Sequence, residues 1–116
     1  MQSARKGYVS ARSQELLTQL GQNIELARIR RRLKASTICS RAGISNQTYQ
    51  RLKKGESGIS LGVLMNVLSA LDLEEAMAMI AAPHLDEVGL TLELAREPER
   101  VRTEGEGGNV KLGSDW

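Results

Sequence analysis

The chain has 116 residues, enough for one small domain and a tail, so a two-domain enzyme is not expected. Its 16 basic and 14 acidic residues give a formal charge of +2, but the two halves differ sharply. Residues 1–54 hold 12 basic and 2 acidic side chains, a balance of +10, whereas residues 55–116 hold 4 and 12, a balance of −8. We therefore expect the first half to attract a polyanion and the second half to avoid one.

Cysteine and histidine are too rare for several kinds of site. Cys39 and His84 are single, so an intrachain disulfide framework and a Cys/His metal cluster are excluded, and no metal or cofactor is expected. No nucleophile with a base and no carboxylate dyad stands out, which argues against an enzyme. The N-terminus lacks the apolar core of a signal peptide, and the longest apolar run, residues 76–82, is far below the ~20 residues of a membrane span. A cytoplasmic protein is expected.

The apolar residues predict an all-α chain. Aromatic residues are scarce, so the core must consist of Leu, Ile, Val, Ala and Met, which favours packed helices. Apolar positions at helical spacing predict a first helix that begins at an N-cap on Ser13 and continues towards Leu33. A second helix is expected over residues 36–42, closed by Gly43, and a third from an N-cap at Ser45 to Gly55.

The C-terminal half is expected to add further helices. Ser60 is expected to cap a helix over residues 61–71, in which eight of eleven residues are apolar. Such a helix must bury two faces, so we expect the second face to meet another copy of the chain, or else the segments that follow. Residues 74–82 form the next segment. Residues 86–96 suit a helix better than a strand, although Val88, Leu90, Leu92 and Leu94 alternate as a strand would.

The strongest motif is residues 35–54, ASTICSRAGISNQTYQRLKK, whose spacing is that of a helix-turn-helix unit. Two short helices that cross steeply need a small residue at the crossing and a flexible residue in the turn, which Cys39 and Gly43 supply. The remaining positions that face the core are apolar: Ile38, Ala42, Ile44, Tyr49 and Leu52. An ordinary helical hairpin is the alternative, but it has no reason to leave the outer face of its second helix so polar.

That outer face carries no carboxylate, which is typical of a helix that meets an anion. Amide side chains can bond bidentately to adenine and Arg to guanine, so we expect base contacts from Asn46, Gln47, Gln50 and Arg51. Hydroxyl groups, lysines and the amino end of the second helix can bind phosphate. Phosphate contacts are expected from Lys34, Ser36, Ser45, Thr48, Lys53 and Lys54.

Residues 20–73, which contain this motif, resemble the lambda-repressor-like, Xre-type helix-turn-helix family. The resemblance implies a compact five-helix domain, usually dimeric, that binds a palindromic operator in double-stranded DNA. The runs NIELARIRRR (23–32), SLGVLMNVLSALDL (60–73) and DEVGLTLELAREPERVR (86–102) are similar to HipB-like antitoxins. That likeness implies a transcriptional repressor that regulates its own operon and binds a HipA-type kinase toxin. The alternatives are a stand-alone repressor of a phage, plasmid or restriction cassette, and an interaction module that does not bind DNA.

The chain departs from the family pattern in four places. Ala35 replaces a Gln that often binds phosphate, which leaves a backbone amide but no side chain for that contact. Arg32 stands where a Gly commonly ends the first helix, and Lys34 where Ser or Thr commonly caps the second. Lys53 stands where the family often has a Glu that pairs with the residue matching Arg28, so that pair is expected to be absent or replaced by Glu56.

These observations suggest four regions. Residues 1–12 are expected to be a flexible arm and residues 13–82 the helix-turn-helix domain. Residues 83–102 are a C-terminal extension that could serve as a dimer or partner surface, and residues 103–116 are a disordered tail. Trp116 ends this tail and is interpreted as a partner anchor, the alternative being an incidental end residue.

Overall fold

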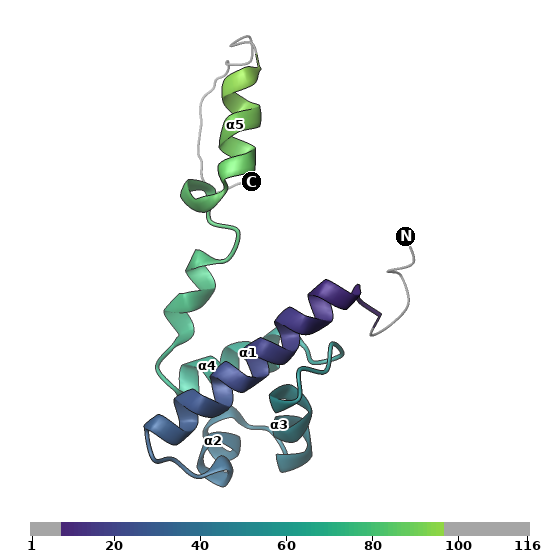
Figure 1. Cartoon of the computed structure of the whole chain (residues 1–116). Helices are drawn as coiled ribbons and strands as arrows, with labels where there is room; N and C mark the ends of the chain where they lie inside the picture. Colours follow the sequence, from purple (N-terminus) through teal and green to yellow (C-terminus); the bar gives the residue numbers. More distant parts are fainter. Residues whose placement is uncertain (1–7, 97–116) are drawn as a thin grey trace. The chain divides into compact units, whose positions relative to one another are not determined.

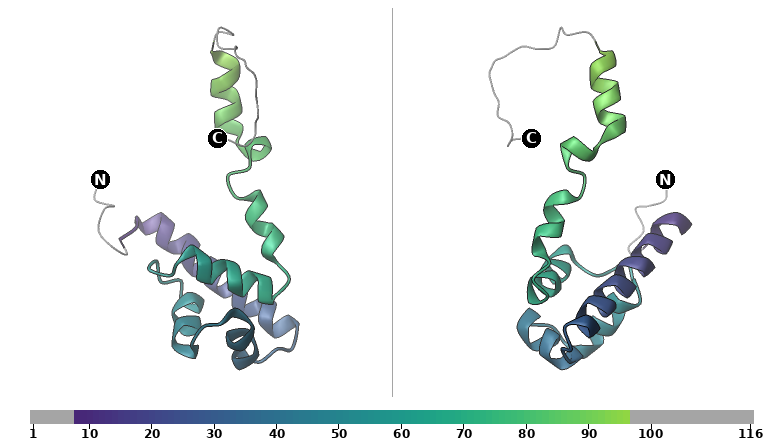
Figure 2. Two further views of the ribbon diagram at one scale, coloured as in Figure 1. Left: turned by 180° about the vertical axis from the view of Figure 1, so that it is seen from behind. Right: turned by 60° about the vertical axis from the view of Figure 1, so that its left-hand side comes forward.

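The computed structural model describes residues 8–96, and every regular element among them is a helix, which confirms the all-α expectation. Figure 1 shows the course of the chain and Figure 2 shows it from two further sides. The α-helices are α1 (Ala11–Arg30), α2 (Ala35–Ala42), α3 (Asn46–Lys53), α4 (Leu61–Ala70) and α5 (Glu87–Ala95). Two 3-10 helices, η2 (Glu74–Met79) and η3 (Pro83–Leu85), lie between α4 and α5.

The described residues divide into two compact units between Met77 and Ala78. In the first unit, α2 packs against α4, α3 packs against α1, and α2 and α3 contact each other (Figure 1). In the second unit, η3 contacts α5, and the preference for a helix over residues 86–96 is confirmed. No helix among residues 8–96 is long and apolar enough to span a membrane.

Serine side chains begin three of the helices. Ser45 and Ser60 cap α3 and α4 as expected, each accepting a hydrogen bond of 3.1 Å from the backbone three residues on. The expected cap at Ser13 is wrong, because α1 begins at Ala11 and its N-cap is Ser10, whose hydroxyl accepts from the Ser13 backbone amide. The expected segment over residues 74–82 is shorter than predicted: η2 ends at Met79, and Ala81 adopts a positive φ of 57°, which a continuing helix does not allow.

The core of the first unit draws on all four of its α-helices. Tyr49 and Ile38 are fully buried, and Ile24 and Leu71 are almost so. The other buried members of this cluster are Cys39, Ala42, Leu52, Val67 and Leu68. The core therefore lies between the α2–α3 pair and the two longer helices, and it fixes α3 against α1.

Two glycines let α1 and the end of α3 approach closely. A Cβ on Gly21 would overlap the carbonyl oxygen of Lys53, so no larger residue fits at this crossing. Gly55 has φ 81°, which favours glycine, and a Cβ there would lie 2.6 Å from the Thr18 Cα. The side-chain amide of Gln14 donates to the Gly55 carbonyl at 2.9 Å. Helix α1 thus holds the C-terminal end of α3 in a single position.

Candidate nucleic-acid interface

The turn between α2 and α3 is a tight left-handed cap. Gly43 ends α2 with φ 71°, and the Ile44 amide donates to the Cys39 carbonyl at 3.0 Å. The Cys39 thiol is buried at the crossing and donates to the Ser45 carbonyl at 3.7 Å. Burial raises the pKa of this thiol, so it remains a neutral, compact packing group at neutral pH.

One face of α3 carries all four side chains that were expected to read bases. At 100° per residue, Asn46, Gln50, Lys54, Gln47 and Arg51 fall within an arc of roughly 140°. Asn46, Gln47, Arg51 and Lys54 are exposed and Gln50 is half-buried. Tyr49 and Leu52 lie on the opposite, buried face. No carboxylate occurs within α3, so its outer face is polar and cationic.

The residues expected to contact phosphate have different surroundings. Lys34, Ser36 and Lys54 are exposed, and no side chain caps α2, which leaves the first amides of that helix without a side-chain acceptor in the described residues. The hydroxyl groups of Ser45 and Thr48 already bond each other at 3.1 Å as part of the α3 cap.

Lys53 points in a different direction from Lys54. It is turned towards α1, where its ammonium lies 3.8 Å from a carboxylate oxygen of Glu25. Lys54, the next residue, has no such carboxylate among the described ion pairs and stays on the outer face. The two lysines are therefore not equivalent, although they are adjacent in the sequence.

Glu25 on α1 is the centre of a polar network that fixes the inner side of α3. Its carboxylate accepts from Arg28 at 2.6 and 3.0 Å and from the Tyr49 hydroxyl at 2.7 Å. Arg28 also donates to the Leu33 carbonyl at 2.6 Å, which holds the chain just after α1. The alternative that Glu56 replaces the family's Glu as the partner of Arg28 is therefore wrong. The partner is Glu25, one turn earlier on the same helix, a spacing at which side chains meet.

This network also settles the protonation states of its members. The hydrogen bonds from Arg28 are the main cause that lowers the pKa of Glu25 from 4.5 to about 2. Burial, followed by the hydrogen bond to Glu25, raises the pKa of Tyr49 from 10.0 to about 12. At neutral pH a charged carboxylate thus accepts from a neutral phenol, and the bond ties α3 to α1.

Glu56 instead pairs with Arg51, at a distance of 2.8 Å between its carboxylate and the Arg51 Nε. The two side chains are 45% and 47% exposed, so the pair lies at the surface and beside the outer face of α3. No sequence pattern predicts this contact, because the two residues are five apart and Glu56 lies after the end of the helix.

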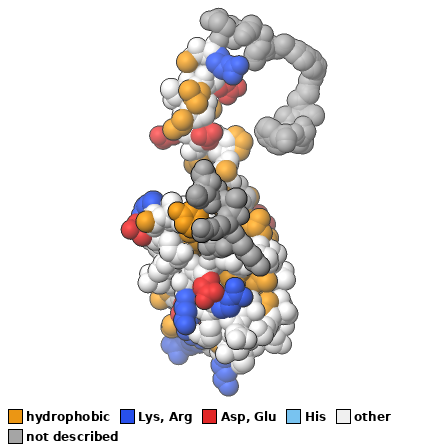
Figure 3. Space-filling view, turned by 90° about the vertical axis from the view of Figure 1, so that its right-hand side faces the viewer, with side chains coloured by type: hydrophobic (Ala, Val, Ile, Leu, Met, Phe, Trp, Pro, Cys, Tyr) orange, Lys and Arg blue, Asp and Glu red, His pale blue; other side chains and the backbone are white. Residues whose placement is uncertain are grey.

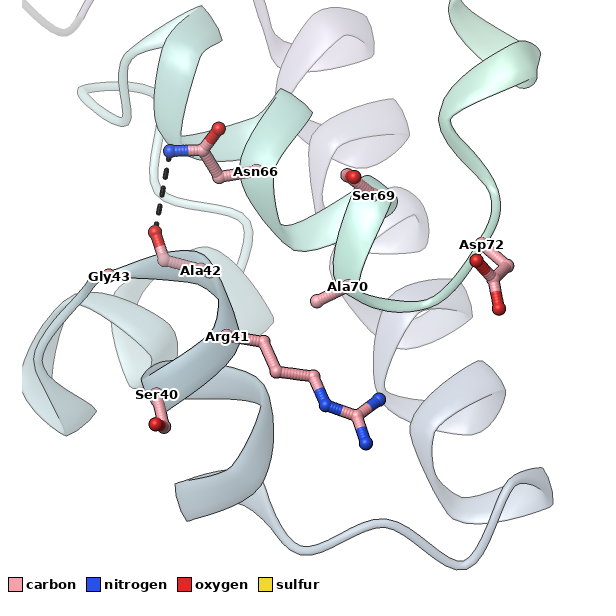
Figure 4. Close-up of a pocket in the computed structure, with 8 residues that line it drawn as sticks. All are labelled: Ser40, Arg41, Ala42, Gly43, Asn66, Ser69, Ala70 and Asp72. Atoms are coloured by element: carbon pink, nitrogen blue, oxygen red, sulfur yellow. Dashed lines mark hydrogen bonds between the residues drawn. The ribbon is translucent and has the colours of Figure 1, made fainter.

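A depression of about 450 Å³ lies where α2 and α4 both end (Figure 4). Arg41 extends across it from α2, and the Asn66 side-chain amide donates to the Ala42 carbonyl at 3.3 Å. Helix C-termini carry partial negative charge, which favours a cation such as Arg41 there. No cluster of three potential metal-ligating side chains occurs anywhere in residues 8–96. The residues that line the depression come from the C-terminal parts of α2 and α4 and from the residues that follow them, beside the contact between the two helices.

Further cations follow the end of α1. Arg30, Arg31 and Arg32 are exposed, and Arg32 adopts φ 55°, a left-handed conformation that favours glycine. The Arg31 side chain donates to the Ala27 carbonyl, so it stays close to its own helix. Figure 3 shows Lys and Arg side chains projecting from the lower end of the first unit in that view.

The second unit has a different surface. On α5, Val88, Leu92 and Leu94 are 71%, 61% and 84% exposed, and the same helix carries Glu87 and Glu93. Figure 3 shows hydrophobic and acidic side chains together on this unit. Asp86 caps this helix by accepting from the Gly89 amide at 2.9 Å. Residues 1–7 of the expected arm, residues 97–102 of the extension, the tail 103–116 and Trp116 lie outside the described residues.

A comparison with family models finds that residues 23–76 match the Cro/C1-type HTH DNA-binding domain. The match covers just under half of the chain, from the middle of α1 to η2, and it contains the whole of α2, α3 and α4. It supports the resemblance to the lambda-repressor-like, Xre-type family. No curated protein is similar enough to the chain to count as a match.

Proposed function

We propose that this protein is a sequence-specific DNA-binding repressor that inserts α3 into the major groove of double-stranded DNA. The carrying observation is the outer face of α3, where three exposed side chains that can bond base edges, Asn46, Gln47 and Arg51, share one arc with Lys54. The match of residues 23–76 to a DNA-binding domain supports the same reading. Phosphate contacts from Lys34, Ser36, Ser45, Thr48, Lys53 and Lys54 would fix the position of the helix on the duplex.

The test is selection of binding sites from randomised duplex DNA, followed by affinity measurements over a range of salt concentrations. We expect one enriched sequence, bound at least about a thousandfold more tightly than random DNA, and a linear fall of log K with log salt. An affinity that does not depend on salt, with no enriched sequence, would contradict the proposal. It would favour the alternative of an interaction module.

We further propose that the repressor is a homodimer that binds a palindromic operator. Its support is the exposure of Val88, Leu92 and Leu94 on α5, which is more apolar side chain than a helix of a monomer usually leaves in water. Two copies of α3 would then meet half-sites about one duplex turn apart, ~34 Å. Light scattering should give twice the chain mass, and Leu92→Glu should shift it towards the monomer. The control is Gln22→Glu, which adds the same charge at an exposed polar residue of α1 and should leave the mass unchanged.

The more specific proposal is the antitoxin of a HipA-type kinase toxin, which regulates its own operon at the nucleoid in the cytoplasm. It rests on the resemblance of three runs to HipB-like antitoxins and on the apolar and acidic surface of α5. Trp116 is proposed as an anchor for this partner. The untagged protein should be expressed with its neighbouring reading frames and its copurifying partners identified by mass spectrometry.

Two results distinguish the antitoxin from a stand-alone repressor. A stoichiometric kinase-like neighbour supports the antitoxin, and removal of the last four residues should then weaken that complex. A dimer that binds only DNA would leave the stand-alone repressor as the better account. An unchanged partner affinity after the truncation would exclude the role of Trp116.

A further inference from the structure

We infer that Glu56 is a positioning residue that holds the guanidinium of Arg51 and thereby sets the base selectivity of α3. The inference rests on the proposed function, since it concerns how α3 reads DNA. It starts from the ion pair of 2.8 Å between the Glu56 carboxylate and the Arg51 Nε, which lies beside the exposed face of the helix.

Backbone hydrogen bonds fix the chain around this pair independently of the ion pair itself. The Glu56 amide donates to the Arg51 carbonyl at 3.1 Å, and the Gly55 amide donates to the Leu52 carbonyl at 2.9 Å. With Gly55 in the left-handed conformation, these two bonds form a Schellman cap at the end of α3. The cap brings the residue after the helix back over Arg51, so the two side chains start from a fixed separation.

Helix α1 prevents this cap from rearranging. The Gly55 carbonyl accepts from the Gln14 side chain at 2.9 Å, and Gly55 itself has no room for a Cβ against Thr18. Because the backbone is held in this way, ordering the Arg51 side chain by Glu56 costs less conformational entropy than it would on a free loop.

The geometry of the bond leaves the recognising end of Arg51 available. A guanidinium has five N–H donors, and the bond to Glu56 uses the single one on Nε. The two terminal amino groups carry the other four, and they can bond in parallel to the O6 and N7 of guanine. A carboxylate at Nε therefore fixes the plane of the guanidinium without competing for the atoms that read the base.

A carboxylate beside DNA also carries a cost, because it repels phosphate. Glu56 should consequently lower the affinity for all DNA while raising the preference for the base pair that Arg51 contacts. Removing a residue that only stabilised the fold would not raise the affinity for all DNA while it lowered the preference for one base pair. Measuring these two quantities in the same variant therefore tests the inference.

The experiment starts from the sequence selected by the wild-type protein and from the base pair whose preference is lost in Arg51→Ala. Affinities for the selected site and for its variants at that base pair are then measured for Glu56→Ala and Glu56→Gln. We expect Glu56→Ala to bind random DNA more tightly and to lose about tenfold of the preference at that base pair. Glu56→Gln, whose carbonyl oxygen can still accept from Nε, should retain part of that preference.

The matched control is Glu15→Ala, which removes an exposed carboxylate that pairs with Arg12 at 3.1 Å on α1. It makes the same change of charge and should leave the base preference intact. An unchanged preference in Glu56→Ala, an equal loss of preference in Glu15→Ala, or an effect of Glu56→Ala on the preference at that base pair that persists in the Arg51→Ala background would overturn the inference. A wild-type protein without any sequence preference would instead overturn the proposed function, and the inference with it.

Discussion

The hydroxyl of Tyr49 on α3 donates a hydrogen bond of 2.7 Å to the carboxylate of Glu25 on α1, although the two residues are 24 positions apart. Tyr49 is fully buried and its ring belongs to the core, so one side chain both packs α3 and orients it. Any change in this bond should therefore affect the stability of the domain and the placement of the face proposed to read DNA.

Tyr49→Phe isolates the hydrogen bond from the packing, because the ring remains. We expect a loss of about 1–2 kcal/mol in the free energy of unfolding, since the bond goes to a charged acceptor that keeps Arg28 as a partner. Urea unfolding monitored by circular dichroism should show a lower midpoint with an unchanged slope. Tyr49→Leu also removes ring contacts and should cost more. Equal stability of Tyr49→Phe and the wild type would mean that the bond contributes nothing.

The lowered pKa of Glu25 predicts a dependence of stability on pH. Its pKa is about 2 in the folded protein against 4.5 as the ordinary value, so the folded state favours the charged carboxylate. The stabilisation is fully present above about pH 4.5 and is lost as the pH falls towards 2. At 1.36 kcal/mol per unit of pKa, this stabilisation has an upper bound of about 3 to 4 kcal/mol, which solvent screening of the partly exposed carboxylate reduces.

The measurement is the free energy of unfolding from pH 7 to pH 2 for the wild type and Glu25→Gln. Other carboxylates titrate in this range, so the difference between the two proteins carries the information. That difference should be largest at neutral pH and shrink below pH 4.5. A difference that stays constant down to pH 2 would show that Glu25 has an ordinary pKa in the folded protein.

Local signals were enough to predict much of this fold. Ser45 and Ser60 cap helices where the sequence places them, and Gly43 and Gly55 have the positive φ that ends a helix. The choice of Ser10 over Ser13 could not be predicted, because both are good caps and the residues between them suit a helix equally well. The sequence therefore predicts that a serine caps this helix, but not which of the two serines does so.

The polar contacts of the site could not be read from spacing. The hydrogen bond between Tyr49 and Glu25 joins two helices across the core. Apolar periodicity predicts which side of a helix is buried, but it does not predict which polar group a buried tyrosine hydroxyl contacts. The pair of Arg51 and Glu56 spans five positions, a separation at which side chains of a continuous helix do not meet. It forms because the chain reverses at Gly55, a geometry that appears only once the cap is placed against α1.

The crossing of α1 and α3 at Gly21 predicts a large effect from a small substitution. A Cβ there would meet the carbonyl oxygens of Lys53 and Leu52, which belong to the backbone and cannot move aside cheaply. We expect Gly21→Ala to destabilise the domain by about 2 kcal/mol or more, although Ala in place of Gly usually stabilises a helix.

The control is Gly62→Ala on α4, where the nearest atom lies 3.9 Å away and stability should stay equal or rise by up to about 1 kcal/mol. Thermal unfolding of both variants decides the matter, and similar melting temperatures would contradict the close crossing.

Arg51 and Lys54 lie on the same face of α3 but should contribute to DNA binding in different ways. Arg51 has a planar group with parallel donors, so Arg51→Ala should cost roughly 1–3 kcal/mol on the selected site and relax the preference at one base pair. Lys54 is an exposed point charge at the end of the helix, so Lys54→Ala should weaken binding to all sequences alike and reduce the salt slope by about one.

Lys53, whose ammonium lies near Glu25, provides the comparison, because Lys53→Ala should reduce the slope by less than Lys54→Ala does. Fluorescence anisotropy with the selected and a scrambled duplex at several salt concentrations measures both quantities. If Arg51→Ala and Lys54→Ala lost sequence preference equally, the assignment of one to a base and the other to a phosphate would be wrong.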